Sequence, residues 1–307
     1  MRLHSLTLSV LILTVPLSIP AFSQSSRSSA PLTSPEERAA LHNGPEWETI
    51  APHLPDPKLA SPAQLETAAD VLRARRFPED ALDYYGYAMA RGGNISNLLN
   101  KMGVVRLELR QTDLAHEMFQ RTVKVQKRNA PAWNNLGVTE YSVKNYRAAI
   151  SDYKQASKID KTSAVYHSNL AMAYFESRDM ESARREFAVA LRIDPTIMHG
   201  GDSGGITAHI VGSENYGELC IEMARLYARQ GRFADAILWL GKSAESGFNV
   251  RDAMHADSTL FPLLKNPEVQ IMLTNADGLR TGRSIASANA PSLGSAPEPT
   301  KPAHLTD

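Results

Sequence analysis

The stretch 164–197 reads AVYHSNLAMAYFESRDMESARREFAVALRIDPTI. An apolar and a small residue in its first half precede an alanine and an aromatic residue in its second half: Leu170, Ala171, Ala183 and Phe187. The 34 residues before it keep the same order, with Leu136, Gly137, Ala149 and Tyr153. A period of this length indicates an array of helical repeats. Such an array presents a long surface, so the sequence predicts an all-α binding protein and no enzyme.

Stepping by 34 residues gives four contiguous units over 62–197 and a fifth over 217–250. Position twenty of the five units carries a methyl side chain: Ala81, Ala115, Ala149, Ala183 and Ala236. Position twenty-four carries a bulky one: Tyr85, Phe119, Tyr153, Phe187 and Leu240. Small residues let two helices approach closely and bulky ones fill the remaining space. Each unit therefore reads as two packed helices.

These residues resemble the tetratricopeptide repeat family, whose pattern is W-x-x-L-G-x-x-Y followed by A, F, A and P. The best unit carries Leu170, Ala171, Tyr174, Ala183, Phe187, Ala190 and Pro195 in phase. Arg106 and Glu140 stand where the family has Tyr, and Lys127 and Lys161 where it has Pro. The resemblance implies a right-handed superhelical solenoid of about five antiparallel helix pairs, closed by a C-terminal helical cap.

The two ends and one internal stretch depart from the repeat. We expect a signal peptide at 1–23, a Ser/Pro-rich linker at 24–61, a Gly-rich insertion at 198–216, a helical cap at 251–275 and a disordered tail at 276–307. The apolar run behind Arg2 is too short for a membrane anchor and is interrupted by Pro16. The sequence thus predicts an exported protein, periplasmic or secreted, without an integral span after signal cleavage.

Two details of these flanking segments stay open. A short helix over 35–41 is compatible with the linker, and Trp47 is the one large apolar group there that could dock on the first unit. Near the C-terminus, eight apolar residues are spaced to cover the open end of the array: Leu260, Phe261, Leu263, Leu264, Val269, Ile271, Met272 and Leu273. A solenoid needs such a cap because its last repeat otherwise exposes its core.

Charge and cysteine content exclude several classes of function. Lys plus Arg and Asp plus Glu both total 33, so the formal net charge is zero. Without a basic stripe, nucleic acid is not an expected partner. The single cysteine, Cys220, excludes an internal disulfide, and its place in the repeat predicts a buried apolar role. No cofactor-binding fingerprint occurs in the sequence.

The insertion spells the nucleophile loop of chymotrypsin-like proteases, with Ser203 in Gly-Asp-Ser-Gly-Gly. That chemistry needs a histidine and an aspartate held by two β-barrels. The sequence before Ser203 is helical repeat, and His209 follows the serine. We therefore interpret the stretch as a flexible connection, with a serine hydrolase as the weakest alternative.

The same insertion contains three possible metal ligands. His199, Asp202 and His209 have the donor chemistry that zinc accepts. No helical face brings the two histidines together, so the spacing favours an unliganded loop and no metal is expected.

The family resemblance assigns a concave groove to positions two, five, nine, twelve and thirteen of each first helix. Carried onto this chain, it gives a candidate peptide-binding site of ten residues: Asn97, Asn100, Val104, Leu107, Asn134, Val138, Tyr141, Ser168, Met172 and Phe175. These side chains suit an extended, mostly apolar segment whose backbone bonds to amides. Apolar residues at helical spacing also occur simply as core, so packing between helices is the competing interpretation.

Two non-catalytic functions follow from this reading. The first is an adaptor of the cell envelope that binds other proteins through an extended segment in the groove. The alternative is an accessory module of glycan or peptidoglycan assembly, which requires Trp133, Tyr141 and Trp239 to be exposed for stacking on sugars. The partner and the oligomeric state do not follow from the sequence.

Overall fold

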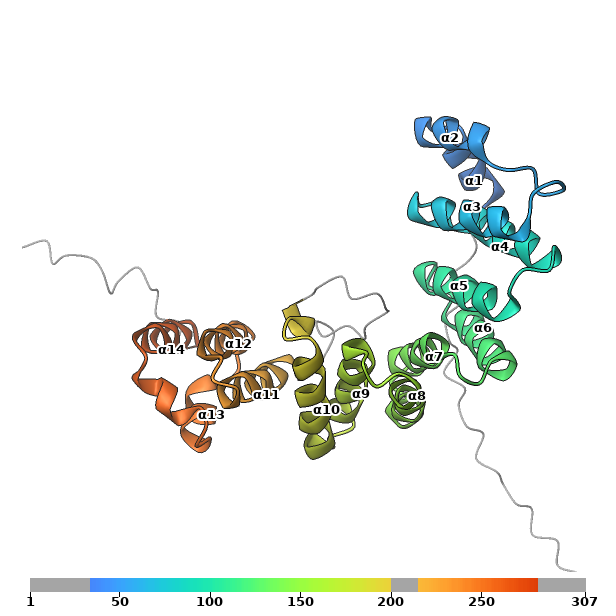
Figure 1. Cartoon of the computed structure of the whole chain (residues 1–307). Helices are drawn as coiled ribbons and strands as arrows, with labels where there is room; N and C mark the ends of the chain where they lie inside the picture. The colour runs from blue at the N-terminus through green and yellow to red at the C-terminus, as the bar shows by residue number, and fades with distance from the viewer. Residues whose placement is uncertain (1–33, 200–214, 281–307) are drawn as a thin grey trace, which may run out of the picture.

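The computed structural model describes residues 34–199 and 215–280, and every regular element in these two ranges is a helix. Figure 1 shows helix pairs that follow one another along a curved path. Four pairs form the first part of the array: α3 (Pro62–Ala74) with α4 (Pro78–Ala90), α5 (Ile95–Glu108) with α6 (Thr112–Val125), α7 (Ala130–Ser142) with α8 (Tyr146–Ile159), and α9 (Ala164–Glu176) with α10 (Met180–Ile193). The predicted all-α solenoid of antiparallel helix pairs is confirmed.

Three short helices precede the first pair: α1 (Pro35–His42), α2 (Pro45–Ile50) and the 3-10 helix η1 (Ala51–His53). Prolines stand in the first turn of each, where a missing N–H costs nothing, and Ser34 forms a capping box with Glu37. Trp47 stacks on His42 at 3.7 Å and packs against Phe77 of the first repeat. The stretch expected as a linker is therefore helical from Pro35 to His53 and docked on the first repeat.

The turn between the two helices of each unit contains one residue in the left-handed region. In four units this residue is a cation with φ between 57° and 67°: Arg76, Arg110, Lys144 and Arg178. In the fifth unit it is Gly231, with φ 73°. The turn geometry thus recurs at position fifteen of every unit, although only one unit supplies the residue that adopts it without strain.

Close contact between small and large side chains holds each pair together. The five alanines of position twenty are at most 2% exposed, and the bulky residues of position twenty-four are at most 1% exposed. A Cβ added to Gly103 would lie 2.5 Å from the ring of Phe119, and one added to Gly137 would lie 2.7 Å from the ring of Tyr153. In the second and third units the absence of a side chain at position eight therefore sets the distance between the two helices.

The fifth pair consists of α11 (Tyr216–Arg229) and α12 (Phe233–Glu245). It joins the fourth pair differently from the others. Arg178 at the start of α10 contacts Glu218 at the start of α11, Arg184 contacts Glu222 half-way along, and Arg232 beyond α11 bonds to the carbonyl oxygen of Pro195 beyond α10. The two helices therefore run in the same direction.

At the junctions between earlier pairs, the two adjoining helices run in opposite directions. His116 near the start of α6 bonds to Thr139 near the end of α7, as antiparallel helices require. Helix α11 thus begins beside the start of α10 and not beside its end.

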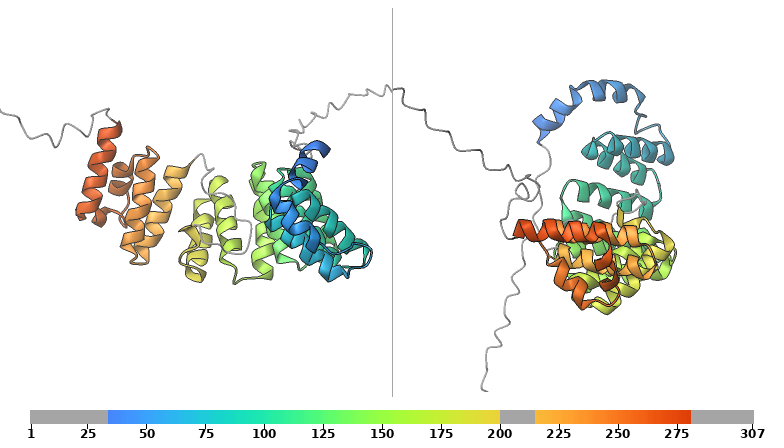
Figure 2. Two further views of the ribbon diagram at one scale, coloured as in Figure 1. Left: turned by 90° about the horizontal axis from the view of Figure 1, so that it is seen from above. Right: turned by 90° about the vertical axis from the view of Figure 1, so that its left-hand side faces the viewer.

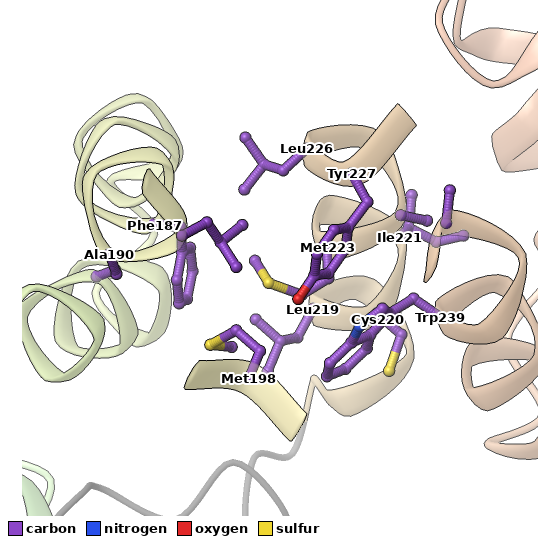
Figure 3. Close-up of a cluster of buried hydrophobic side chains, with 14 of the residues drawn as sticks. Phe187, Ala190, Met198, Leu219, Cys220, Ile221, Met223, Leu226, Tyr227 and Trp239 are labelled. Atoms are coloured by element: carbon purple, nitrogen blue, oxygen red, sulfur yellow. The ribbon is translucent and has the colours of Figure 1, made fainter. Parts of the chain in front are cut away.

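A buried cluster fills the space between the fourth and fifth pairs. Ile197 and Met198, from the 3-10 helix η2 (Ile197–His199), lie in the same apolar cluster as Phe187, Leu219 and Met223. Figure 3 shows Phe187 of α10, Met198 of η2 and Met223 of α11 together in this cluster. Cys220 is also buried here, and burial raises the pKa of its thiol to about 11. The thiol is thus a packing group at neutral pH.

Three helices follow the last pair: α13 (Val250–Ala256), the 3-10 helix η4 (Phe261–Lys265) and α14 (Pro267–Arg280). Figure 2 shows them at the end of the array opposite α1. Leu260, Val269 and Leu273 are at most 1% exposed, as expected for a cap. Phe261 and Ile271 are 49% and 63% exposed, against expectation. Ile271 points outward because Val269 and Leu273 occupy the buried side of α14 and Ile271 lies midway between them in sequence.

Several expectations fall on residues that the structure does not describe. They include the signal peptide, Ser203, Asp202, His209 and the tail beyond 280. Residues 276–280, expected at the start of that tail, continue α14. Among the described residues, none of the helices has the length and apolar character needed to cross a bilayer.

Adding one methyl group at the close contacts tests the packing argument. Gly103→Ala and Gly137→Ala should each lower the free energy of unfolding by ~1–2 kcal/mol, because overpacking outweighs the gain in helix propensity. Gly86→Ala is the control, since a Cβ there meets no atom within 4 Å, and it should raise stability by ~0.5–1 kcal/mol. Urea denaturation measures all three, and equal stabilisation by the three changes would contradict the contact.

Candidate peptide-binding groove

The first helices of four units, α3, α5, α7 and α9, lie in succession with parallel directions. Side chains that meet across them are separated by 35 residues, one more than the repeat: Glu66 and Lys101, Arg73 and Glu108, Asn100 and Asn135, Asn134 and Asn169. Lys101 also meets Asp70, 31 residues away, and 31 and 35 differ by about one helical turn, so the same face of successive first helices is in contact. A single register therefore runs along this face from α3 to α9.

Four asparagines form a chain of hydrogen bonds across α5, α7 and α9. The amide of Asn169 donates to Asn134 at 2.8 Å, Asn134 donates to Asn135 at 3.4 Å, and Asn135 donates to Asn100 at 3.1 Å. Asn134 and Asn169 are each 1% exposed. The two innermost amides thus satisfy one another and are closed to a ligand, whereas Asn100 at the end of the chain is half-buried.

A network of ion pairs occupies the N-terminal part of the same face. The ammonium of Lys101 lies 2.7 Å from Glu66 and 2.6 Å from Asp70, and Arg73 pairs with Glu108 at 2.7 Å. Sequence reasoning missed this network because it considered position five and not position six, where Lys101 stands. The separation of one repeat plus one residue between opposite charges is the signal that would have revealed it.

The ten predicted site residues differ in what they offer to a ligand. Met172 and Phe175 are 2% and 0% exposed, so their side chains belong to the core between repeats. Ser168 is buried as well and bonds to the carbonyl oxygen of Val165 in its own helix. Together with Asn134, these residues present almost no surface. The accessible members are Asn97, which is exposed, and the half-buried Asn100, Val104, Leu107, Val138 and Tyr141.

One polar atom beside Tyr141 has no hydrogen-bond partner among the described residues. It is Oε1 of Glu176, which lies at position thirteen of the fourth unit and is shielded from solvent. Burial raises the pKa of Tyr141 above its ordinary value, and the nearby charge of Glu176 raises it further. The pair therefore combines a phenol that stays protonated with a carboxylate oxygen that can accept a hydrogen bond from an N–H donor.

A second group of polar side chains lies where Glu140 replaces the tyrosine typical of the repeat. Glu140 is 7% exposed, accepts a hydrogen bond from Asn145 at 2.7 Å and lies 3.4 Å from His116. Burial raises the pKa of Asp152 to about 7, and the neighbouring charge of Glu140 adds to the effect. Asp152 is thus the carboxylate in the third repeat whose ionisation works against folding.

The described residues do not form the sites that the catalytic and sugar-binding alternatives require. No strand occurs in 34–199 or 215–280, and no three His, Cys, Asp or Glu side chains of those ranges are placed to hold a metal ion. The proposed nucleophile Ser203 lies outside these ranges. Trp239 is 1% exposed, and Trp133 is half-buried with its indole N–H bonded to the carbonyl oxygen of Lys127. The set of exposed rings that glycan binding requires is therefore not formed.

The tetratricopeptide repeat family model matches residues 100–164. This segment begins within α5 and ends at the first residue of α9. It contains three members of the asparagine chain, Asn100, Asn134 and Asn135. Over this segment the chain is similar to that family, and the helix pairs on both sides continue the same arrangement. None of the curated proteins compared matches the chain.

Several solved structures are similar to this chain in their arrangement of helices. PilF of Pseudomonas aeruginosa is 18% identical with a TM-score of 0.48, over 74% of this chain and 93% of that one. MamA from Desulfovibrio magneticus RS-1 is 16% identical with a TM-score of 0.44, over 67% and 99%. YrrB, described as a TPR protein with an unusual peptide-binding site, is 22% identical with a TM-score of 0.40, over 45% and 71%.

The raised pKa of Asp152 predicts the pH dependence of stability. The folded state retains this proton up to about pH 7, whereas a carboxyl of ordinary pKa has lost it by about pH 5. Folding therefore takes up a proton in this window, and stability falls as the pH rises through it. Asp152→Asn should raise the free energy of unfolding by ~1 kcal/mol at pH 8, after allowance for solvent screening, and change it little at pH 4.

Denaturant titrations at the two pH values measure this difference. The exposed Glu117, changed to Gln, is the control and should show no such pH dependence. A pH-independent effect of Asp152→Asn would show that its carboxylate is not destabilising.

Proposed function

We propose that this chain is an exported, non-catalytic scaffold that holds an extended, mostly apolar segment of a partner protein along α5, α7 and α9. Support comes from the repeat architecture, which builds continuous surfaces by stacking. The observation that carries the proposal is the row of accessible apolar side chains on consecutive first helices: Val104, Leu107, Val138 and Tyr141. These four side chains are half-buried, so each contacts the core while keeping surface for a ligand.

The polar groups around this row suit the backbone of an extended segment. Such a segment has N–H and C=O groups that need partners once water is excluded. Asn97 and Asn100 supply amides at one end of the row. Backbone recognition by these groups and side-chain recognition by the apolar row would give affinity and specificity respectively.

Matched substitutions in one repeat test the groove. Val104→Ser with Leu107→Ser removes two accessible apolar side chains of α5, whereas Leu114→Ser with Val125→Ser removes the same residue types from α6, where they are 37% and 60% exposed. The α5 pair should weaken binding of peptides selected from a display library by at least ~10-fold, about 1.4 kcal/mol. The α6 pair should leave it unchanged.

Fluorescence anisotropy gives the two affinities, and circular dichroism verifies that both variants keep the fold. A photo-crosslinking residue at position 107 should in addition capture partners that the same residue at position 114 does not. Equal binding by the two folded variants would place recognition outside the groove.

Export is the second part of the proposal, and its support lies in residues 1–23. An apolar run behind Arg2 ends at Ala21-Phe22-Ser23, which offers small residues to a signal peptidase. Expression of the whole chain in a bacterium with a periplasm should yield a mature protein that begins at Gln24. N-terminal sequencing of the periplasmic fraction measures this, and an intact Met1 on cytoplasmic protein would contradict export.

A further inference from the structure

A cleft of about 620 Å³ lies between α10 and α11, at the junction where the two helices run in the same direction. Four arginines line it: Arg184, Arg185, Arg192 and Arg229. Its remaining walls are mainly apolar, with Ala188, Leu191, Pro195 and Leu226. The cleft shares no residue with the candidate groove on α5, α7 and α9.

Two of the four arginines are already engaged. Arg184 makes two hydrogen bonds to Glu222, at 2.7 and 2.9 Å, and Glu222 is also held by Arg225. Although burial alone would raise the pKa of Glu222, hydrogen bonds from these two arginines keep it below its ordinary value. Arg185 pairs with Glu181 of its own helix. These pairs fix one end of the cleft and leave the other end open.

Arg192 and Arg229 define the open end. Both are exposed, and neither has an ion-pair partner among the described residues. Each lies in the last turn of its helix, Arg192 in α10 and Arg229 in α11. Because the two helices run in the same direction, their last turns meet at the same end of the junction. Asp194, the carboxylate adjacent to this end, is already bonded to Thr196.

A cation in the last turn of a helix has an ordinary structural role, since it complements the helix dipole by ~0.3–1 kcal/mol. That role accounts for each arginine separately, but it does not require two of them to line one cleft from facing helices. Two like charges at one cleft repel each other unless an anion lies between them. Arg192 and Arg229 together therefore form a receptor for negative charge.

We propose that this cleft binds a segment of a partner protein in which carboxylates flank an apolar side chain. The guanidinium groups of Arg192 and Arg229 pair with the carboxylates, for which arginine offers a matching fork of donors. The apolar side chain lies between them on Ala188 and Pro195, the apolar lining residues that keep accessible surface. A carboxylate peptide fits better than a polyanion because the walls are apolar and the chain as a whole carries no net charge.

The experiment uses the chain from residue 24 onward and a fluorescent peptide in which glutamates alternate with leucines. Anisotropy at low ionic strength should show binding that weakens as salt is added. Arg192→Ala with Arg229→Ala should weaken it at least ten-fold. The control changes Lys158, at the position of α8 that corresponds to Arg192 in α10, together with Arg147 of α8, both to Ala. It removes the same charge and should leave binding unchanged.

Competing ligands complete the test. A peptide with glutamine in place of glutamate should bind at least ten-fold more weakly, whereas one with lysine should not bind. Failure of the glutamate peptide to bind the unchanged protein, or an equal loss in the α8 control, would overturn the proposal. Tighter binding of a single-stranded oligonucleotide or of vesicles of anionic lipid would assign the cleft to phosphate groups and overturn it as well.

Discussion

The contact between a residue without bulk and an aromatic ring sets the geometry of this protein. Gly103 against Phe119 and Gly137 against Tyr153 leave no room for even one methyl group between the helices of a pair. Position eight is glycine or alanine in every unit, so the pairs are similar in thickness and successive first helices meet through the same face in one register. The asparagine chain and the row of accessible apolar side chains both depend on that register.

Most of the fold could be predicted because close packing restricts residue type at fixed positions. Only alanine fits at position twenty, and the array repeats that requirement five times. The sequence allowed for a helix at α1 and for docking of Trp47, but α2 and η1 were missed, since their prolines were taken as helix breakers although each stands in a first turn. The direction of α11 was not predictable either, because it depends on the path of the chain through the insertion and on long-range pairs such as Arg184 with Glu222.

The residues predicted for the candidate groove differ in accessibility in a way that the sequence did not indicate. A family pattern shows which residues face inward, but it does not show how deeply the neighbouring repeat covers them. Met172 and Phe175 are covered by their surroundings, whereas Val104 and Leu107 keep accessible surface. The unpartnered oxygen of Glu176 arises from a similar tertiary effect, since its burial depends on side chains far away in sequence. In the proposed function, recognition is distributed over α5 to α9, and the charged cleft between α10 and α11 is a separate surface.

The reversal at α11 also limits the length of what the groove can hold. First helices keep a common direction only from α3 to α9, and α11 lies antiparallel to α9. With adjacent first helices ~10 Å apart, the three helices of the proposed groove, α5, α7 and α9, span ~20 Å. An extended chain advances ~3.3 Å per residue, so a segment held across this groove would be roughly six residues long. The change of helix direction at α11 thus limits the size of the segment that the proposed groove accepts.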